Sequence, residues 1–555
     1  MNRVLVLILF SIVNILVSAA KLNQFQSYNK VERDRSLYGV RVSKSQGGVV
    51  PIPQSIKYDS KVSALPLADS STFKFNIDLS NCDILTNATA RYREIIFNKP
   101  TGPQQPIVVL LSDGPIVSAL SISVTSKKCE HMPYFEMNEN YSLIVNANGS
   151  STLSAHSVWG VLRGLETFSQ LIFNDTSHGK LMIRVAAITD FPRFKHRGVL
   201  IDTSRHFLSV EKILQNIDLC AQNKMNVLHW HIVDEVAFPY VSTRFPDLSG
   251  KGAYTQHHIY SQSDVAYIIE YGRLRGIRII PEFDTPGHSL SWGPGQPGLL
   301  TKCYTKGNPD GTFGPIDPSN TANYDFLLAL FQEVTHVFPD SYIHLGGDEV
   351  PFGCWLSNPD IIKFMQLYNI SNGAKLEEYY IKNLLSLVEQ ARTNISYTVW
   401  QEVFDNKVKV NPTTIIHEWK SGSDKDRGYE LGNITKAGLR ALTSSCWYLN
   451  YVSYGPDWYK YYACDPHNFT GTAQQKQLVL GGEACMWGEY VDATNSISRT
   501  WPRASVVAER LWSAASNRDP SLLMPRLEEH RCRLLMRGYP VEPVNGPGYC
   551  DHEWP

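Results

Sequence analysis

From residue 197 onward, the sequence repeats one pattern that limits what the chain can fold into. An apolar run rich in β-branched residues is followed by a polar cluster and then by a segment whose apolar residues recur at helical spacing. The runs are residues 198–201, 226–232, 277–283, 342–345, 397–399, 414–416, 440–443 and 478–480 with an extension to 486. Eight such units over about 350 residues predict an α/β fold, a (β/α)8 TIM barrel, with a doubly wound open sheet as the competing architecture.

Polar and aromatic side chains occur at or just beyond the carboxyl end of each predicted strand. They are Asp202, Arg205, Asp234, Asp284, His288, Asp348, Glu349, Trp400, Trp419, Tyr448, Asn450, Trp487 and Glu489. In a barrel, the carboxyl ends of all strands converge on one mouth, whereas an open sheet would keep many of these residues apart. Their placement therefore favours the barrel.

A different pattern precedes the barrel. Strand-like runs at 49–52, 73–77, 107–111 and 141–145 lead to residues 154–172, whose apolar positions have helical spacing. We expect a signal peptide at 1–20, a small N-terminal α+β domain with an antiparallel sheet at 21–190, and the barrel at 191–555. The N-terminal domain has no chemical constellation of its own and is predicted to be structural.

The first 20 residues have the composition of a secretory signal. Arg3 precedes an apolar stretch at 4–17, and Ser18, Ala19 and Ala20 provide small residues for cleavage. A signal anchor is the alternative, but the stretch is short for a bilayer span. Passage through the secretory pathway, to lysosomes or the exterior, agrees with sequons at Asn87, Asn140, Asn148, Asn174, Asn369, Asn394, Asn433 and Asn468.

Ten cysteines in an oxidising compartment are expected to be partly paired. Spacing suggests four local bridges and leaves Cys220 and Cys485, which lie inside apolar segments, as free core thiols. The suggested pairs are Cys82 with Cys129, Cys303 with Cys354, Cys446 with Cys464, and Cys532 with Cys550. Spacing alone does not establish this connectivity. No Cys or His spacing resembles a zinc site, so we predict no metal and no cofactor.

The overall charge argues against a polyanionic partner. The chain has 52 basic and 53 acidic residues, which give a formal net charge of −1 at pH 7. The strongly basic balance typical of nucleic-acid binding or of polybasic attachment to membranes is missing. We therefore expect a neutral substrate, no nucleic-acid partner and no stable membrane anchor.

The sharpest local signal is the doublet Asp348 and Glu349, which follows two glycines at the end of a predicted strand. Consecutive carboxylates at a strand end point in different directions and can perform different tasks. Cleavage of a glycosidic bond needs a protonated acid beside the leaving oxygen and a negative charge that stabilises developing positive charge. A bare Asp-Glu pair is more often a solvated turn, so the interpretation depends on its surroundings.

Those surroundings favour an active site. His288 and Asp234 fall on neighbouring strand ends, where a carboxyl-imidazole-carboxyl relay can tune the pKa of the acid. The indoles of Trp400, Trp419 and Trp487 offer flat apolar faces for a sugar ring and an acetamido methyl group. Polar residues lie between these indoles along the predicted mouth, which suits a carbohydrate pocket better than a core; they are Arg205, Tyr448, Asn450 and Glu489.

Four motifs cover much of the predicted barrel: residues 202–206 (Asp-Thr-Ser-Arg-His), 284–288 (Asp-Thr-Pro-Gly-His), 346–349 (Gly-Gly-Asp-Glu) and 482–489 (Gly-Glu-Ala-Cys-Met-Trp-Gly-Glu). Together they resemble the β-N-acetylhexosaminidases of glycoside hydrolase family 20, especially the animal lysosomal type. The resemblance extends over nearly all of the mature chain. It implies an exo-acting, retaining hydrolase that releases terminal β-linked GlcNAc, and also GalNAc, from glycans, glycoconjugates or chitooligosaccharides.

The resemblance also implies a role for each candidate residue. The 2-acetamido oxygen of the substrate attacks the anomeric carbon, Glu349 is the general acid and later the base, and Asp348 orients the acetamido group. Tyr448 is expected to hydrogen-bond the acetamido oxygen, and the three indoles to enclose its methyl group and the sugar ring. Arg205, Asn450 and Glu489 are expected to hold the outer hydroxyls. Animal relatives further imply a homodimer.

Two positions depart from part of the family. Some relatives have Asp at the position of Asn450, and some that handle acidic glycans have Arg at the position of Tyr451. We therefore expect neutral substrates rather than sulfated or sialylated ones. Two rival interpretations remain at this stage: a conventional two-carboxylate glycosidase on the same barrel, and a carbohydrate-binding protein without catalysis.

Overall fold

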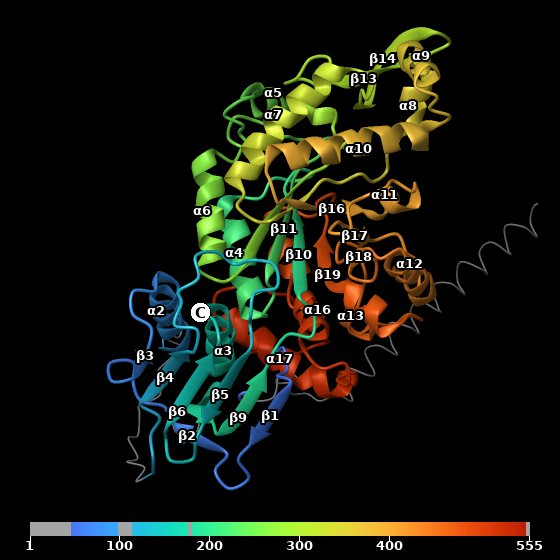
Figure 1. Cartoon of the computed structure of the whole chain (residues 1–555). Helices are drawn as coiled ribbons and strands as arrows, with labels where there is room; N and C mark the ends of the chain where they lie inside the picture. Colours follow the sequence, from blue (N-terminus) through green and yellow to red (C-terminus); the bar gives the residue numbers. More distant parts are fainter. Residues whose placement is uncertain (1–45, 98–113, 176–179, 551–555) are drawn as a thin grey trace, which may run out of the picture.

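The computed structural model describes residues 46–97, 114–175 and 180–550. The predicted signal peptide and the predicted strand at 107–111 lie outside these residues. Figure 1 shows a sheet domain formed by the N-terminal part of the chain, packed against one end of a barrel formed by the rest. The barrel's last helix, α17 (Pro520–Met536), runs back along the junction of the two parts.

The N-terminal domain is built on a six-stranded sheet. Its strand order is β1 (Ser55–Tyr58), β9 (Ala186–Asp190), β5 (Tyr141–Val145), β6 (Ser151–Ala155), β4 (Ala119–Val124) and β3 (Lys74–Ile77). The pairings β1–β9, β9–β5 and β5–β6 are antiparallel, as predicted, and the structure adds parallel pairings of β6 with β4 and of β4 with β3. A second antiparallel sheet consists of β2 (Ala64–Pro66), β8 (Lys180–Arg184) and β7 (Ile172–Asp175).

Two helices cover the larger sheet, α2 (Asp83–Phe97) and α3 (Val158–Gln170). Every residue of α3 is buried, because one side of the helix packs on β5 and β6 and the other contacts the barrel helix α4 (Val210–Gln222). The Ser157 side chain caps the helix by accepting from the Gly160 amide. The helix predicted within residues 154–172 is confirmed at Val158–Gln170, whereas residues 154–155 belong to β6 and Ile172 begins β7.

The strand predicted at 49–52 is wrong. Residues 49–52 form no strand, and β1 begins only at Ser55. Pro51 has no amide hydrogen to donate to a neighbouring strand. The amides on either side of it bond to side chains instead, Val50 to Gln170 and Ile52 to Glu509. The segment therefore connects α3 to the barrel rather than joining a sheet.

All eight predicted barrel strands are present, and they close on one another. The strands are β10 (His196–Asp202), β11 (Val227–Val233), β12 (Arg278–Phe283), β15 (Tyr342–His344), β16 (Ser396–Trp400), β17 (Ile415–Glu418), β18 (Arg440–Thr443) and β19 (Val479–Met486). Neighbours are parallel throughout, and β10 pairs with β19 to complete the ring. The (β/α)8 barrel is confirmed, and the open sheet is excluded.

Helices surround the barrel and short elements fill its loops (Figure 1). The longer helices are α4, α6 (Gln262–Arg273), α7 (Thr321–Val337), α10 (Gly373–Ala391), α12 (Asp424–Lys436), α16 (Arg503–Trp512) and α17. The short elements are α5 (Asp247–Gly252), η1 (Leu290–Trp292), α8 (Phe352–Ser357), α9 (Pro359–Leu367), α11 (Gln401–Asp405), α13 (Trp458–Ala463), α14 (Ala473–Leu478) and α15 (Ser496–Thr500), together with the hairpin β13 (Leu300–Thr305) and β14 (Asn308–Ile316).

The predicted cysteine framework is present. The bonds Cys82–Cys129, Cys303–Cys354, Cys446–Cys464 and Cys532–Cys550 are formed, and Cys220 and Cys485 are free and buried. Four disulfides are typical of a chain that folds in the secretory pathway. Asn433 is half-buried, whereas the other seven sequon asparagines are exposed. Among the described residues, no helix is both long and apolar enough to cross a membrane.

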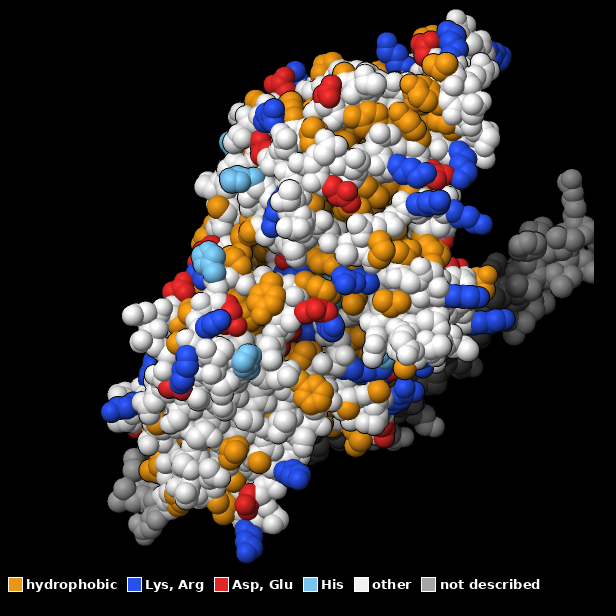
Figure 2. Space-filling view, viewed as in Figure 1, with side chains coloured by type: hydrophobic (Ala, Val, Ile, Leu, Met, Phe, Trp, Pro, Cys, Tyr) orange, Lys and Arg blue, Asp and Glu red, His pale blue; other side chains and the backbone are white. Residues whose placement is uncertain are grey.

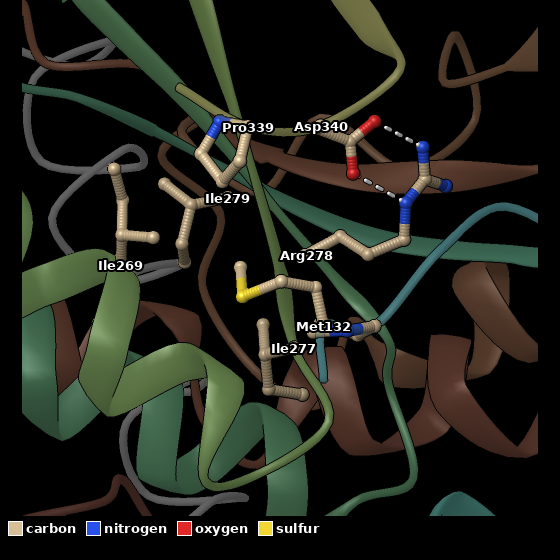
Figure 3. A pocket seen from close by; sticks show the side chains of 8 residues that line it. Met132, Ile269, Ile277, Arg278, Ile279, Pro339 and Asp340 are labelled. Carbon is tan, nitrogen blue, oxygen red and sulfur yellow. Dashed lines mark hydrogen bonds and ion pairs between the residues drawn. The ribbon is translucent and has the colours of Figure 1, made fainter. Parts of the chain in front are cut away.

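The N-terminal domain closes the base of the barrel. Phe135 packs against the cluster of inward-facing side chains at the amino ends of the strands, next to Tyr342. Figure 3 shows the small pocket beside this contact, where Met132 faces Ile277 and Ile279 under the Arg278–Asp340 ion pair. Its volume of about 20 Å³ fits about one water molecule, so this pocket is too small for a sugar.

Buried charges also join the two domains. Glu139, whose side chain is 2 % exposed, accepts hydrogen bonds from Arg163 on α3, from Arg197 on β10 and from Asn226 before β11. Burial of this carboxylate is compensated by two guanidinium groups, which keep its pKa below the usual range. The barrel and the sheet domain therefore share one buried ion cluster.

Replacing Glu139 should destabilise the whole chain. Glu139→Gln leaves two buried guanidinium groups without their counter-charge, and we expect the free energy of unfolding in urea to fall by about 3–5 kcal/mol. Lys195→Gln is the control, because Lys195 pairs with Glu136 on the surface, where both side chains are about half exposed. The control should cost less than about 1 kcal/mol. Equal losses in the two variants would contradict a special role for the buried cluster.

Candidate active site

Every barrel strand delivers candidate residues to the same end of the barrel. Asp202 and Trp400 end their strands, Trp487 comes directly after the last residue of β19, and the remaining candidates occupy the loops that follow the strands. The mouth is thus formed by Arg205, Asp234, Asp284, His288, Asp348, Glu349, Trp419, Tyr448, Asn450 and Glu489 together with the strand-end residues. The sequence prediction that these residues share one edge of the fold agrees with the strand order.

The loop after β15 explains the two glycines. Gly346 and Gly347 have φ of 69° and 97°, in the left-handed region that favours glycine. A Cβ at Gly346 would lie 1.6 Å from Asp284 Oδ1, and the Gly347 amide donates to that same oxygen at 3.0 Å. The backbone therefore passes tightly over Asp284 before it presents the acidic doublet. Glu349 itself has φ of 48°, a strained value for a residue with a side chain.

The two adjacent carboxylates occupy different environments. The Asp348 side chain is 12 % exposed, and its buried Oδ1 has no hydrogen-bond partner among the described residues, whereas the Glu349 side chain is 59 % exposed. His288 Nε2 lies 3.6 Å from Asp348 Oδ2 and 3.6 Å from Glu349 Oε2. One imidazole nitrogen therefore faces both carboxylates. Hydrogen bonding to His288, followed by its positive charge, lowers the pKa of Glu349 in the free protein.

Behind His288, a chain of alternating carboxylates and imidazoles leads into the barrel. His288 Nδ1 lies 3.2 Å from Asp234 Oδ1, and Asp234 Oδ2 lies 2.7 Å from His231 Nε2 and 2.8 Å from the Arg205 guanidinium. Burial opposes ionisation of Asp234, but the two imidazoles hold its pKa below the usual range. Although burial opposes its charge, the pKa of His288 is raised by the nearby Asp348 and Asp284 carboxyl groups. The predicted relay partners are thus brought together.

Asp284 has the opposite tendency. Complete burial and the negative charge of Asp348 raise the pKa of Asp284 well above the usual range. A neutral Asp284 can lie beneath the acidic doublet without repelling it, and it accepts the Gly347 amide at the same time. The carboxyl group therefore supports the loop rather than adding to its charge.

The aromatic candidates form one cluster. Trp400, Tyr448 and Trp487 are buried together with Cys485, and Trp419 packs against them. The Trp419 and Tyr448 rings are nearly parallel, with 7° between their planes and 6.2 Å between centroids. The Arg205 guanidinium lies 5.3 Å from the centre of the Trp487 ring. Three indoles and one phenol thus line a single wall of the mouth.

Two predicted residues remain at the margin. Asn450 is half-buried, and its buried side-chain oxygen has no hydrogen-bond partner in the part of the chain that the structure describes, an arrangement that a ligand hydroxyl can complete. Its backbone oxygen accepts from Arg499. Glu489 is exposed, and its charge acts on Arg205 without a direct hydrogen bond among those the structure describes. The structure therefore does not join these two residues to the central group.

Sequence reasoning missed two supporting carboxylates. Glu282 on β12 accepts from the Trp400 indole at 2.6 Å, and Glu402 on α11 accepts from the Trp419 indole at 2.9 Å. Burial and the charge of Asp348 raise the pKa of Glu402 to about 7. The available signal was Glu282 itself, since an acidic residue inside an otherwise apolar parallel strand needs a buried partner.

A cluster of imidazoles beneath the mouth is the group of described residues that most resembles a metal centre. Ring nitrogens of His229, His344 and His417 lie within 4.8 Å of one another. The His229 and His344 rings, however, stack with 28° between their planes and 4.6 Å between centroids. In-plane lone pairs on stacked rings do not converge on one ion, so the cluster does not match a tetrahedral zinc site.

Comparison with known proteins identifies the family. The model named glycosyl hydrolase family 20, catalytic domain, matches residues 194–515, and one named beta-acetyl hexosaminidase like matches residues 49–171. The chain is 48 % identical to the mouse beta-hexosaminidase subunit alpha over 91 % of this chain and 95 % of that subunit. It is 49 % identical to the human subunit beta over 85 % of this chain and 84 % of that subunit.

A solved structure shows the same architecture. The chitobiase of Flavobacterium johnsoniae superposes with a TM-score of 0.75 at 30 % identity, covering 88 % of this chain and 73 % of that one. The match spans both the sheet domain and the barrel, in agreement with the two family models. The chain therefore belongs to glycosyl hydrolase family 20.

Proposed function

We propose that this protein removes terminal, non-reducing β-linked N-acetylhexosamine from glycans by substrate-assisted catalysis. The observation that carries the proposal is the position of Asp348 and Glu349 around one imidazole nitrogen of His288, at the same end of the barrel as a cluster of three indoles. Family membership, together with near-complete coverage of beta-hexosaminidase subunits, supports the same activity. A binding protein without catalysis is not favoured, because both carboxylates and their relay are intact.

In this mechanism the exposed carboxyl group of Glu349 protonates the glycosidic oxygen and later activates water. The less exposed Asp348, with its unpartnered Oδ1, accepts the acetamido N–H and steadies the positive charge that develops as the acetamido oxygen attacks C1. Tyr448 donates to the acetamido oxygen, and Trp400, Trp419 and Trp487 enclose its methyl group and the ring. A sugar without the acetamido group has no nucleophile, which explains the selectivity.

Arg205, Asn450 and Glu489 hold the outer hydroxyls of the terminal sugar in this proposal. Support comes from the charged Arg205, which Asp202 and Asp234 anchor at 3.0 and 2.8 Å, and from the unpartnered oxygen of Asn450. A pocket closed behind the terminal sugar restricts cleavage to chain ends. GlcNAc and GalNAc differ at one outer hydroxyl, and this set of groups decides between them.

A homodimer is the oligomeric state we propose. Tyr451, Val452 and Tyr454 follow Asn450 directly and are 61 %, 86 % and 95 % exposed. Three exposed large side chains so close together in the sequence are suited to contact with a second copy. Figure 2 shows acidic and basic side chains interspersed over the visible face rather than a single-sign patch.

We further propose that the protein acts in lysosomes or outside the cell.

Substitution of the two carboxylates separates their roles. Glu349→Gln should reduce kcat by at least about 1,000-fold on glycosides with a poor leaving group, and far less on those with an acidic aglycone, because only the former need protonation. Asp348→Asn should slow both classes and weaken an acetamido-cyclised thiazoline inhibitor. Steady-state kinetics with matched aglycones measures these effects. Near wild-type turnover of poor leaving groups by Glu349→Gln would rule out its assignment, and lack of thiazoline inhibition in the wild type would favour a conventional two-carboxylate glycosidase.

The pH profile tests the influence of His288. Glu349 must be protonated to act as the acid, and His288 lowers its pKa, so kcat/KM should fall with rising pH already in the acidic range. His288→Gln removes that positive charge, the pKa of Glu349 rises, and the descending limb of kcat/KM should move to higher pH. His336→Gln, which alters an exposed histidine on α7, is the control. A limb that stays in place or moves to lower pH in His288→Gln would contradict the relay.

Neutral substrates should be preferred. Tyr451 brings no charge to the rim beside Asn450, so the sulfate of a 6-sulfated GlcNAc glycoside would find no cation at position 451. We expect its kcat/KM to be lower than that of the neutral glycoside by about tenfold or more. A kinetic panel of neutral and sulfated GlcNAc and GalNAc glycosides at acidic pH measures the difference. Equal efficiency on the sulfated sugar would contradict the assignment of Tyr451.

A further inference from the structure

Glu282 lies inside the barrel, directly beneath the mouth, and is fully buried. Its Oε1 accepts from Trp400 Nε1 at 2.6 Å and lies 3.0 Å from His344 Nδ1. Its Oε2 lies 2.5 Å from His231 Nδ1 and 3.1 Å from His229 Nε2. One carboxylate therefore contacts side chains of strands β11, β15 and β16, and each of its oxygens has two partners.

These contacts reach both functional walls of the mouth. Through Oε1, Glu282 fixes the indole of Trp400 in the aromatic wall. Through Oε2, it holds His231, whose other nitrogen is 2.7 Å from Asp234, and Asp234 in turn lies 3.2 Å from His288. His288 faces the acidic doublet. The same carboxylate is thus the nearest common support of the acetamide pocket and of the general acid.

Opposite charges on Glu282 and His231 strengthen their contact and make His231 the hydrogen-bond donor. Burial opposes the ionised form of Glu282, but the surrounding His344 and His231 imidazoles hold its pKa well below the usual range. Burial likewise opposes the charged form of His231, yet Glu282 and Asp234 raise its pKa well above the usual range. The ionisable groups that face Glu282 are His229, His231, His344, Asp284, Glu483 and Cys485. A charged His231 donates from both nitrogens and so aligns two carboxylates at once.

We propose that Glu282 is a positioning residue that couples the general acid Glu349 to the acetamide pocket. It acts through His231, Asp234 and His288 on one side and through Trp400 on the other. The inference rests on the proposed roles of Glu349 and Trp400. It predicts that one buried carboxylate, out of contact with the sugar, influences both leaving-group protonation and acetamide binding.

The chain contains a matched control, a buried carboxylate that reaches His231 only through His229 and Glu282. Glu483 on β19 is also buried, and it also holds two imidazoles, His196 at 2.6 Å and His229 at 2.7 Å. It bonds to neither His231 nor Trp400 among the contacts that the structure describes. Loss of its charge should therefore lower stability without the specific effects on the mouth.

The test compares Glu282→Gln with Glu483→Gln in the full-length protein. The amide keeps the shape of the side chain, but His231 retains only Asp234 as a counter-charge and is held less firmly. Asp234 and His288 then lose alignment, which weakens the hydrogen bond from His288 that lowers the pKa of Glu349. For Glu282→Gln we expect kcat/KM on a poor leaving group to fall about tenfold or more, the descending pH limb to move to higher pH, and thiazoline affinity to weaken. Glu483→Gln should lower the melting temperature by a similar amount and leave the limb and the inhibitor affinity unchanged.

Glu282→Asp separates charge from geometry and remains informative if the amide variant does not fold. The shorter carboxylate keeps the charge but cannot reach both Trp400 and His231. It should therefore retain the wild-type pH limb if it stays with His231, or the inhibitor affinity if it stays with Trp400, but not both. Wild-type values for both in Glu282→Asp would overturn the inference.

The same measurements distinguish failure of the inference from failure of the proposed function. If Glu282→Gln matches Glu483→Gln in pH limb and thiazoline affinity while the wild type is inhibited by thiazoline and Glu349→Gln is inactive, Glu282 is only structural and the inference is wrong. If the wild type neither releases N-acetylhexosamine nor binds thiazoline, the proposed function itself fails. The wild-type and Glu349→Gln assays are therefore run first.

Discussion

Closure of eight parallel strands into a barrel removes their inward-facing side chains from water, so every charge inside must be paired within the barrel. This constraint shapes the region beneath the mouth. Glu282 and Glu483 each hold two or more imidazoles, and the carboxylates and imidazoles alternate from His196 near the base to His288 at the mouth. The acidic doublet lies at the end of this series, where the last imidazole, that of His288, meets the solvent-exposed Glu349.

The loop after β15 places two neighbouring carboxylates in different environments. Left-handed glycines let the backbone turn over Asp284, after which Asp348 points into the pocket and Glu349 points toward solvent. Tight packing beneath the loop prevents it from relaxing to an easier conformation. Consecutive residues of the same charge type thus differ in burial and partners, which is what an acid and an orienting group require.

Much of this arrangement is readable from sequence because strand patterns and strand ends are local signals. The eight barrel strands follow from apolar runs, and residues such as Asp234 and Trp419 are placed by their position just after a run. Residues 49–52 look equally apolar, but Pro51 cannot donate to a ladder, so that segment is not a strand. Glu282 escaped notice because its partners lie on strands far along the chain, and cross-barrel bonds leave no trace in local spacing. The positive φ of Glu349 is likewise visible only in three dimensions. The same holds for the position of His288 beside both Asp348 and Glu349.

The buried ion pairs inside the barrel contribute most to stability at mildly acidic pH. Although burial opposes it, Glu483 and Glu282 raise the pKa of His229 from its ordinary value of 6.5 to about 9, so this ion pair contributes its full stability below pH 6.5 and loses it as pH rises toward 9. The pKa of Glu282 is lowered from 4.5, so its contribution is complete above pH 4.5 and is lost as pH falls through the lowered value. Both contributions are complete only between about pH 4.5 and 6.5. Glu349, with its lowered pKa, also needs acid to hold a proton. The conditions that best preserve the buried relay are therefore the acidic ones under which its outermost carboxyl group can act.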